Sequence, residues 1–239
     1  LISKVESGIE FPQVRNVETF SLFQPYEDKY RIHKQKTGFD FYEGQSVFNG
    51  DIILRPTGLI GHSISNSNGY FIANMQLENS KMISDTFTFN ANWFDADTAD
   101  LVLLTADGEV SFRSNNVRTH IDIKERVGEF FSNGEGSYVE MPANQYICYI
   151  DKLHWDMDRE LLTLGKNDIN SIGSQFVSVH PKQDSLSFIA KNSTYDLKDN
   201  IINVFGVQEL LVADAIIYPS KGFLIEKDAF IPTITEANI

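Results

Sequence analysis

The sequence contains one cysteine and few basic residues, and each scarcity excludes a class of protein. With Cys148 alone among 239 residues, the chain can form no internal disulfide and no thiolate metal cluster. Cys148 lies in the apolar run 146–150, so we expect a buried structural thiol. Lys and Arg number 20 against 33 Asp and Glu, which gives a formal charge of -13. This charge would repel nucleic acid and an anionic membrane surface.

Sequence motifs of several enzyme classes are missing as well. No strand-like segment leads into GxGxxG or GxxxxGK[ST], and GxSxG does not occur. The acidic residues are too scattered to single out a glycosidase pair. No apolar run approaches the roughly 18 residues of a membrane-spanning helix. We therefore expect no enzymatic activity, no cofactor, no nucleic-acid partner and no transmembrane segment.

The chain is rich in aromatic residues arranged with the period of a β-strand. It has 18 Phe and 9 Tyr, and 42% of its residues are hydrophobic, which is enough to bury a core. Residues 86–93 alternate without a break, which predicts Phe87, Phe89, Ala91 and Trp93 on one face of a strand. Residues 117–123 repeat the pattern. Helical periodicity is nearly absent, and only 123–131 could form a turn or two of helix.

Short strands separated by polar turns extend over most of the chain. Further strands are expected at 48–54, 70–77, 101–105, 110–112, 137–141, 145–150, 161–164, 176–180, 185–190, 194–196, 201–212 and 223–226. This spacing predicts an all-β fold, an elongated stack of antiparallel strands of the β-taco or β-solenoid kind, with a β-sandwich as the alternative. Residues 1–38 are expected to be an irregular arm or incomplete unit, and 39–239 the stacked β module. Because neither end carries a recognisable terminal signal, we expect a mature form or a fragment of a longer protein.

One segment resembles a known family. Residues 194–207 begin with Tyr195-Asp196, continue through a polar turn and a strand, and reach Gly206-Val207. This order resembles a rung of the OstA-like β-jellyroll or β-taco proteins of lipopolysaccharide transport. Residues 117–158 are similar to large β-rich envelope proteins of the Bacteroidetes. The resemblance implies an extracytoplasmic place in the envelope, in the periplasm or at the outer membrane, and a hydrophobic groove that shields acyl chains, but no catalytic residue.

Three carboxylates fall close together in the segment 95–100. Asp95, Asp97 and Asp100 are expected in a short loop after a strand, and Ca²⁺ prefers several oxygen ligands from such a segment. A solvated turn is the alternative. The turn is favoured because Asp100 stands where an EF-hand loop needs glycine.

Two histidines are each followed by an aspartate two positions later in the sequence. On a strand, His154, Asp156 and Asp158 would share one face, as would His120 and Asp122, and either set could serve a metal or acid–base chemistry. A polar outer face opposite Trp155 explains the spacing equally well.

Aromatic residues offer a third type of site. A platform for sugar rings could form from six of them, although core positions are the more common fate. They are Trp93, Phe94, Tyr138, Tyr146, Tyr149 and Trp155.

The sequence favours a non-catalytic scaffold or conduit of a cell-envelope assembly that shields lipid. Its expected partners are other envelope proteins or neighbouring units of the same protein, with lipid or glycan as further candidates. A carbohydrate- or ligand-binding β-sandwich at the cell surface is the second hypothesis, and a β-helix hydrolase is the third.

Overall fold

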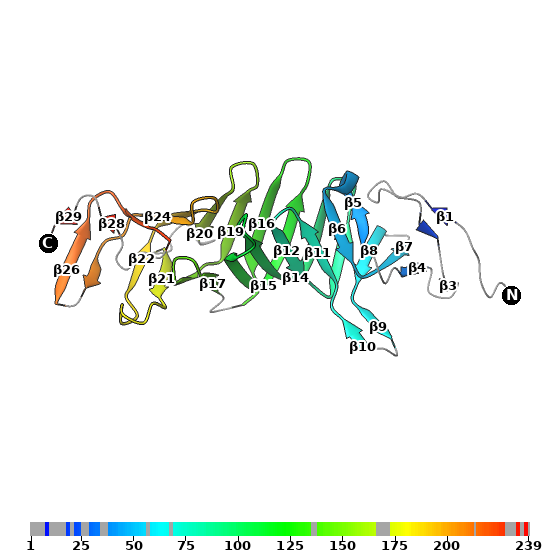
Figure 1. The fold of residues 1–239 in the computed structure, drawn as a ribbon, viewed down its shortest axis with the longest axis horizontal. Coiled ribbons are helices and arrows are strands. Elements are labelled where there is room, and N and C mark those ends of the chain that lie inside the picture. Colours follow the sequence, from blue (N-terminus) through cyan, green and yellow to red (C-terminus); the bar gives the residue numbers. More distant parts are fainter. Residues whose placement is uncertain are drawn as a thin grey trace. The chain divides into compact units, whose positions relative to one another are not determined.

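The computed structural model describes residues 8–9, 18–19, 22–24, 29–33, 38–55, 58–66, 69–134, 138–165, 173–212, 214–227, 233–234 and 237–238. Most of these residues are in antiparallel β-strands, and the described part of the chain holds no α-helix, which confirms the all-β class with its large antiparallel sheet (Figure 1). Among the described residues, therefore, there is no helix that could cross a membrane.

The chain divides into two compact units, which are described separately. Unit 1 comprises residues 1–101 and 118–125, and unit 2 comprises 102–117 and 126–239. Two long strands contribute to both units, namely β14 (Trp93–Leu104) and β15 (Val110–Asp122). The expected boundary after residue 38 stays a prediction, since most of 1–37 lies outside the described residues. The described pairing of 30–33 with 51–54 belongs to unit 1.

The described residues of unit 1 form thirteen shorter strands and the 3-10 turn η2 (Tyr42–Gly44). The strands are β1 (Gly8–Ile9), β2 (Glu18–Thr19), β3 (Leu22–Gln24), β4 (Lys29–His33), β5 (Phe39–Phe41), β6 (Ser46–Asn49), β7 (Asp51–Arg55), β8 (Gly58–His62), β9 (Ile64–Asn66), β10 (Gly69–Phe71), β11 (Asn74–Leu77), β12 (Ser80–Ile83) and β13 (Thr86–Phe89). Strands β4, β7, β8, β13 and β14 pair in that order in one layer. Strands β5, β6, β11 and β12 form the other.

Phenylalanine rings fill the space between these two layers. Phe41 and Phe48 come from the β5–β6 layer, and their ring centroids lie 4.3 and 5.1 Å from that of Phe89 on β13. All three side chains are buried, at no more than 2% exposure. Gly61 on β8 leaves room for this cluster, because a Cβ there would lie 2.5 Å from Phe48 Cζ. The inward face predicted for Phe87 and Phe89 is thus confirmed.

The strand predicted over 86–93 ends earlier than expected. β13 stops at Phe89, a turn closed by the Asn90 N–H to Trp93 C=O bond (2.9 Å) follows, and β14 starts at Trp93. Ala91 is therefore exposed, and Phe94 rather than Trp93 is buried. The turn shifts the inward positions by one residue, which alternation alone cannot reveal.

Unit 2 contains the remaining strands. They are β16 (Val127–Ser132), β17 (Tyr138–Met141), β18 (Tyr146–Tyr149), β19 (Lys152–Asp156), β20 (Leu161–Gly165), β21 (Ser174–Ser178), β22 (Ser187–Ala190), β23 (Asn192–Asp196), β24 (Ile201–Phe205), β25 (Leu210–Val212), β26 (Ala215–Pro219), β27 (Phe223–Ile225), β28 (Thr233–Ile234) and β29 (Ala237–Asn238). Residues 123–126 form a turn and 127–132 a strand, so the predicted helical turn is wrong. The expected strands 48–54, 70–77 and 201–212 each split in two.

Hairpins of unit 2 alternate between two layers. The first layer runs β16, β19, β20, β23, β24, β27, and the second runs β17, β18, β21, β22. The chain therefore adds one hairpin to each layer in turn. This is stacking of antiparallel hairpins, and because each unit has two layers, the sandwich description also fits it.

Candidate functional site

The three predicted cation ligands lie on a strand. Asp95, Asp97 and Asp100 belong to β14, so the expected loop is wrong, and two successive exposed residues at 97–98 mark an irregularity of the kind a β-bulge produces. Asp95 Oδ1 lies 2.7 Å from His120 Nδ1, and both side chains are 40% exposed. Within the described ranges, no three His, Cys, Asp or Glu side chains are grouped as a metal site requires. Cation binding by these aspartates stays a prediction.

The His154 set does not converge on a common point. Asp156 Oδ1 accepts a hydrogen bond from the Arg159 N–H (3.0 Å), and Asp158 pairs with Arg126. The acidic group near His154 is instead that of Glu129, at 4.0 Å from Nδ1. Trp155 opposite is buried, which confirms the predicted polar outer face. His120 and Asp122 also lie on an outward face, with Ile121 buried between them.

The proposed aromatic platform is divided between core and surface. Phe94, Tyr146 and Trp155 are buried, at 5% exposure or less, and cannot present a surface to a sugar. Tyr138 and Tyr149 share the outward face of β17 and β18, but their rings are inclined by 62° with centroids 5.8 Å apart. A coplanar platform is therefore not formed by these five residues.

Trp93, the sixth aromatic, lies beside the histidine of the Asp95 pair. Its ring centroid is 5.2 Å from that of His120, and its backbone C=O accepts the Tyr42 hydroxyl at 2.9 Å. Burial, followed by the negative charge of Asp95, raises the pKa of Tyr42 well above its usual value of 10, so the hydroxyl remains a donor. Tyr42 thereby fixes the start of β14.

Three turns of the same kind follow strands β15, β19 and β23. Each begins with an aspartate that caps the turn: Asp122 Oδ1 accepts the Glu125 N–H, and Asp156 and Asp196 do the same for their own turns. Each ends with a residue at positive φ, and the three are Arg126, Glu160 and Asn200.

The residues at positive φ link each turn to the next. The carbonyl of Arg126 accepts the Met157 N–H (3.1 Å), and that of Glu160 accepts the Leu197 N–H (2.9 Å). Val179 N–H donates in the same way to the carbonyl of Gln145, another residue at positive φ, in the second layer (2.8 Å). The pairs Ile121-Asp122, Trp155-Asp156 and Tyr195-Asp196 therefore occupy equivalent positions at the start of their turns.

A buried polar cluster joins distant parts of unit 2. The Tyr195 hydroxyl lies 2.9 Å from both Ser111 Oγ and Asn200 Oδ1, and the Ser111 hydroxyl donates to the same amide oxygen at 2.8 Å. Asn144 Nδ2 donates to the carbonyls of Asn200 and Ile225, at 2.7 and 2.9 Å. Burial raises the pKa of Tyr195 to about 12. Sequence reasoning did not find this cluster, in which Ser111 and Asn200, a hydrogen-bonded pair, are 89 residues apart.

The inward positions of unit 2 form rows of the chain's own side chains. Successive strands of the first layer place Phe130, Leu153, Leu164, Ser193, Val204 and Phe223 in register. All six are at most 4% exposed. The second layer contributes Val139, Cys148, Phe176 and Phe188, and Phe188 meets Phe223 with ring centroids 4.9 Å apart. Cys148 is buried and unbridged, as expected.

A small pocket between the layers is formed by described residues of unit 2. It is lined by Ser114, Val117, Phe130, Ser132, Tyr138, Val139, Ile150, Asp151 and Leu153. Its interior has room for little more than a water molecule.

Comparisons with known protein families and curated proteins found no relative from which a function could be transferred. No protein-family model matches the chain, and a search of curated proteins gave no match either. The resemblance to the OstA-like family therefore stays a prediction.

Proposed function

We propose that this chain is a non-catalytic structural module, and that the stacked β-hairpins of its unit 2 serve as a support for neighbouring protein units. The observation that carries the proposal is the filling of the inward rows. Side chains such as Leu153, Leu164 and Phe176 occupy them at 1% exposure or less. Close packing of this kind stabilises a fold, and it fills the inward rows formed by the described residues of unit 2.

The arrangement of hydrogen bonds supports the same role. The turn-to-turn bonds from Met157 and Leu197 tie each hairpin to the one before it, and the cluster around Tyr195 ties strands distant in sequence. Repeated units that each contact the next form an extended, self-supporting stack. A scaffold needs such continuity, whereas a catalytic site needs converging reactive groups.

The packed interior favours the scaffold over the lipid conduit that the resemblance implies. An acyl chain needs an open apolar groove, and the described inward positions of unit 2 are occupied by side chains of the protein itself. The small pocket beside Ile150 is too short for a lipid tail. Envelope location and envelope partners rest on the resemblance alone, and cell fractionation tests them.

Titration of the purified chain with a fluorescent fatty acid separates these roles. A structural module gives no saturable rise in fluorescence. Stoichiometric, saturable binding would overturn the proposal in favour of a conduit. A fatty-acid-binding protein titrated under the same conditions serves as the control that saturable binding is detectable.

A further inference from the structure

A hairpin at one end of unit 2 leaves apolar side chains uncovered. Strand β25 pairs with β26 and β26 with β29, so these three strands form a sheet of their own. β26 lies at the end of unit 2 that is farthest from β16 (Figure 1). Leu210 anchors the hairpin, because it is only 1% exposed. None of the five residues of β26 is buried, however, whereas β22 and β24 bury every second residue.

Three exposed apolar residues of this hairpin lie together on one face. Leu211 and Ile216 are directly opposite one another in the pairing of β25 with β26, and Tyr218 follows Ile216 two positions along β26. Residues two apart on a strand point to the same side, so the three side chains form one surface, called the end patch. They are 62, 43 and 45% exposed. Single exposed apolar residues are normal on a protein surface, but a contiguous group is typical of a contact site.

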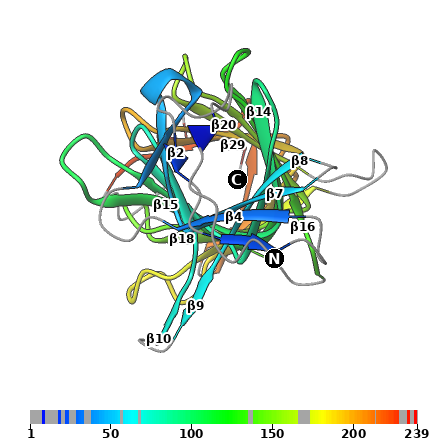
Figure 2. The ribbon, with the colours of Figure 1, turned by 90° about the vertical axis from the view of Figure 1, so that its right-hand side faces the viewer.

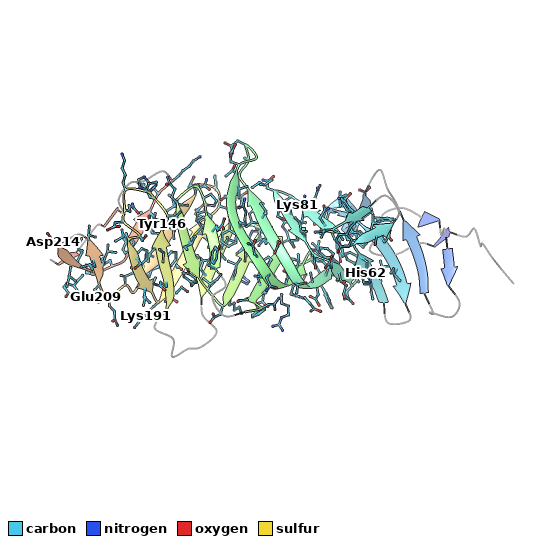
Figure 3. The ribbon with its side chains drawn as sticks, turned by 90° about the horizontal axis from the view of Figure 1, so that it is seen from below. His62, Lys81, Tyr146, Lys191, Glu209 and Asp214 are labelled. Carbon is cyan, nitrogen blue, oxygen red and sulfur yellow. The ribbon has the colours of Figure 1, made fainter. Side chains whose placement is uncertain are left out.

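Carboxylates stand at both ends of the end patch. Glu209 directly precedes β25 and is two positions from Leu211, and Asp214 lies where the hairpin turns from β25 to β26. Both acidic residues are exposed, and both lie at the same end of unit 2 (Figure 3). Residues 205–220 contain these two acidic residues and no Lys or Arg. The end patch therefore combines exposed apolar side chains with a negatively charged rim.

Charge decides which kind of partner fits the end patch. A second copy would bring the same carboxylates together, and each chain carries a formal charge of -13. An anionic lipid surface would be repelled in the same way. A protein segment whose apolar side chains lie between Lys or Arg residues complements both the apolar residues and the rim, since opposite charges across an interface favour the correct partner.

We propose that the end patch binds a basic, apolar segment of a neighbouring protein. The inference rests on the proposed structural role, for which it specifies the chemistry of the neighbour. Apolar side chains of that segment cover Leu211, Ile216 and Tyr218, and its Lys or Arg residues pair with Glu209 and Asp214. The end patch is small beside the roughly 800 Å² per partner of a standard interface, so this contact is weak on its own.

A second exposed hairpin provides a matched comparison. Strands β9 and β10 pair with each other and extend away from the other strands of unit 1 (Figures 1 and 2). Phe71 on β10 and Ile72 beside it are 47 and 46% exposed, close to the values for Ile216 and Tyr218. Residues 63–77, which include this hairpin, contain no Asp, Glu, Lys or Arg. This hairpin thus exposes similar apolar groups without a charged rim.

Photo-crosslinking in the cells that make the protein tests the proposal. p-Benzoylphenylalanine replaces Leu211 or, in a second variant, Ile216; the control variants carry it at Phe71 or at the exposed Thr163 of unit 2. Irradiation of either end-patch variant should give an adduct with another protein. Mass spectrometry should place the attachment in an apolar segment flanked by Lys or Arg, and adducts of the control variants should not contain this segment. Circular dichroism verifies that each variant is folded.

Two neutralising substitutions test the role of the rim. In the variant crosslinked through position 211, Glu209→Gln with Asp214→Asn should lower the adduct yield by about two- to tenfold, because each exposed ion pair contributes only a little to binding. Asp158→Asn with Asp199→Asn removes the same charge from exposed turns of unit 2 and should leave the yield unchanged.

Several results would overturn the inference. They are the absence of an adduct at both end-patch positions, an attachment to a second copy, to lipid or to a segment without basic residues, and a yield that does not change when Glu209 and Asp214 are neutralised. The fatty-acid titration uses the purified chain alone, so it decides the structural role independently of these results.

Discussion

A methyl group added at Gly61 should destabilise unit 1. Gly61 faces inward on β8, and a Cβ there would lie 2.5 Å from Phe48 Cζ and 2.8 Å from Phe89 Cε2. The Phe48 ring cannot move aside easily, because it is fully buried and has the Phe41 and Phe87 rings as further neighbours, at 6.1 and 5.6 Å. Overpacking of a core costs about 1 to 3 kcal/mol. Alanine also lowers the conformational entropy of the unfolded chain, which offsets about 0.4 to 1 kcal/mol of this destabilisation.

Urea unfolding, monitored by tryptophan fluorescence, measures the loss of stability in unit 1 alone. Trp93 lies in unit 1 and Trp155 in unit 2, so a Trp155→Phe background reports unit 1. A net loss of about 1 to 2 kcal/mol for Gly61→Ala lowers the midpoint by roughly 1 M urea at a typical slope. Gly165→Ala, followed in a Trp93→Phe background, is the matched control, since no atom lies within 4 Å of its added Cβ.

A second substitution identifies the contact responsible. Phe48→Leu removes the outer ring atoms that a Cβ at position 61 would meet, so the double variant should lose less stability than the sum of the two single changes. A coupling of about 1 kcal/mol or more is expected for residues in contact. An unchanged midpoint for Gly61→Ala would refute the packing described for unit 1, and so would strict additivity with Phe48→Leu.

Three further predictions concern hydrogen bonds and turns. Tyr195→Phe should lower the free energy of unfolding of unit 2 by about 1 to 2 kcal/mol in urea, because buried groups of Ser111 and Asn200 lose a hydrogen-bond partner. A neutral result would contradict the cluster. The Asp85 carboxyl should titrate below its ordinary pKa of 3.8, because the Tyr70 hydroxyl and then a serine hydroxyl donate to it. Its folded pKa is depressed, so the stabilisation of the hairpin formed by β9 and β10 is present above pH 3.8 and lost as pH falls through the folded value. A carboxyl ¹³C titration with a pKa at or above 3.8 would refute this. Glu160→Gly should raise the free energy of unfolding by up to about 1 kcal/mol, since glycine adopts positive φ without strain. Thr163→Gly in the adjoining strand should lower it by a similar amount. Equal effects of the two substitutions would contradict the turn geometry.

The fold class could be predicted from the sequence because strand periodicity is a local property. Phe87, Phe89, Ile121 and Trp155 are buried where alternation places them. Periodicity fails where a turn changes the phase of the alternation, as between Phe89 and Trp93. It also fails at 123–131, where apolar residues at helical spacing belong to a turn and a strand.

The contacts that join the hairpins could not be predicted in the same way. Ser111 and Tyr195 are 84 residues apart, and no local pattern links them. The residues at positive φ that connect successive turns differ in chemistry, since Arg126, Glu160 and Asn200 share a backbone conformation and not a side chain. Asp95, Asp97 and Asp100 were expected in a loop because polar residues are typical of loops. Polar residues also occupy the outward face of an exposed strand, and these three lie on β14.

Native mass spectrometry of the protein isolated gently from its own cells tests the structural role most directly. The proposal predicts complexes whose extra mass is that of protein chains, either further copies or other proteins, which dissociate into the unmodified polypeptide. A retained lipid, glycan or small ligand at a fixed stoichiometry would contradict it.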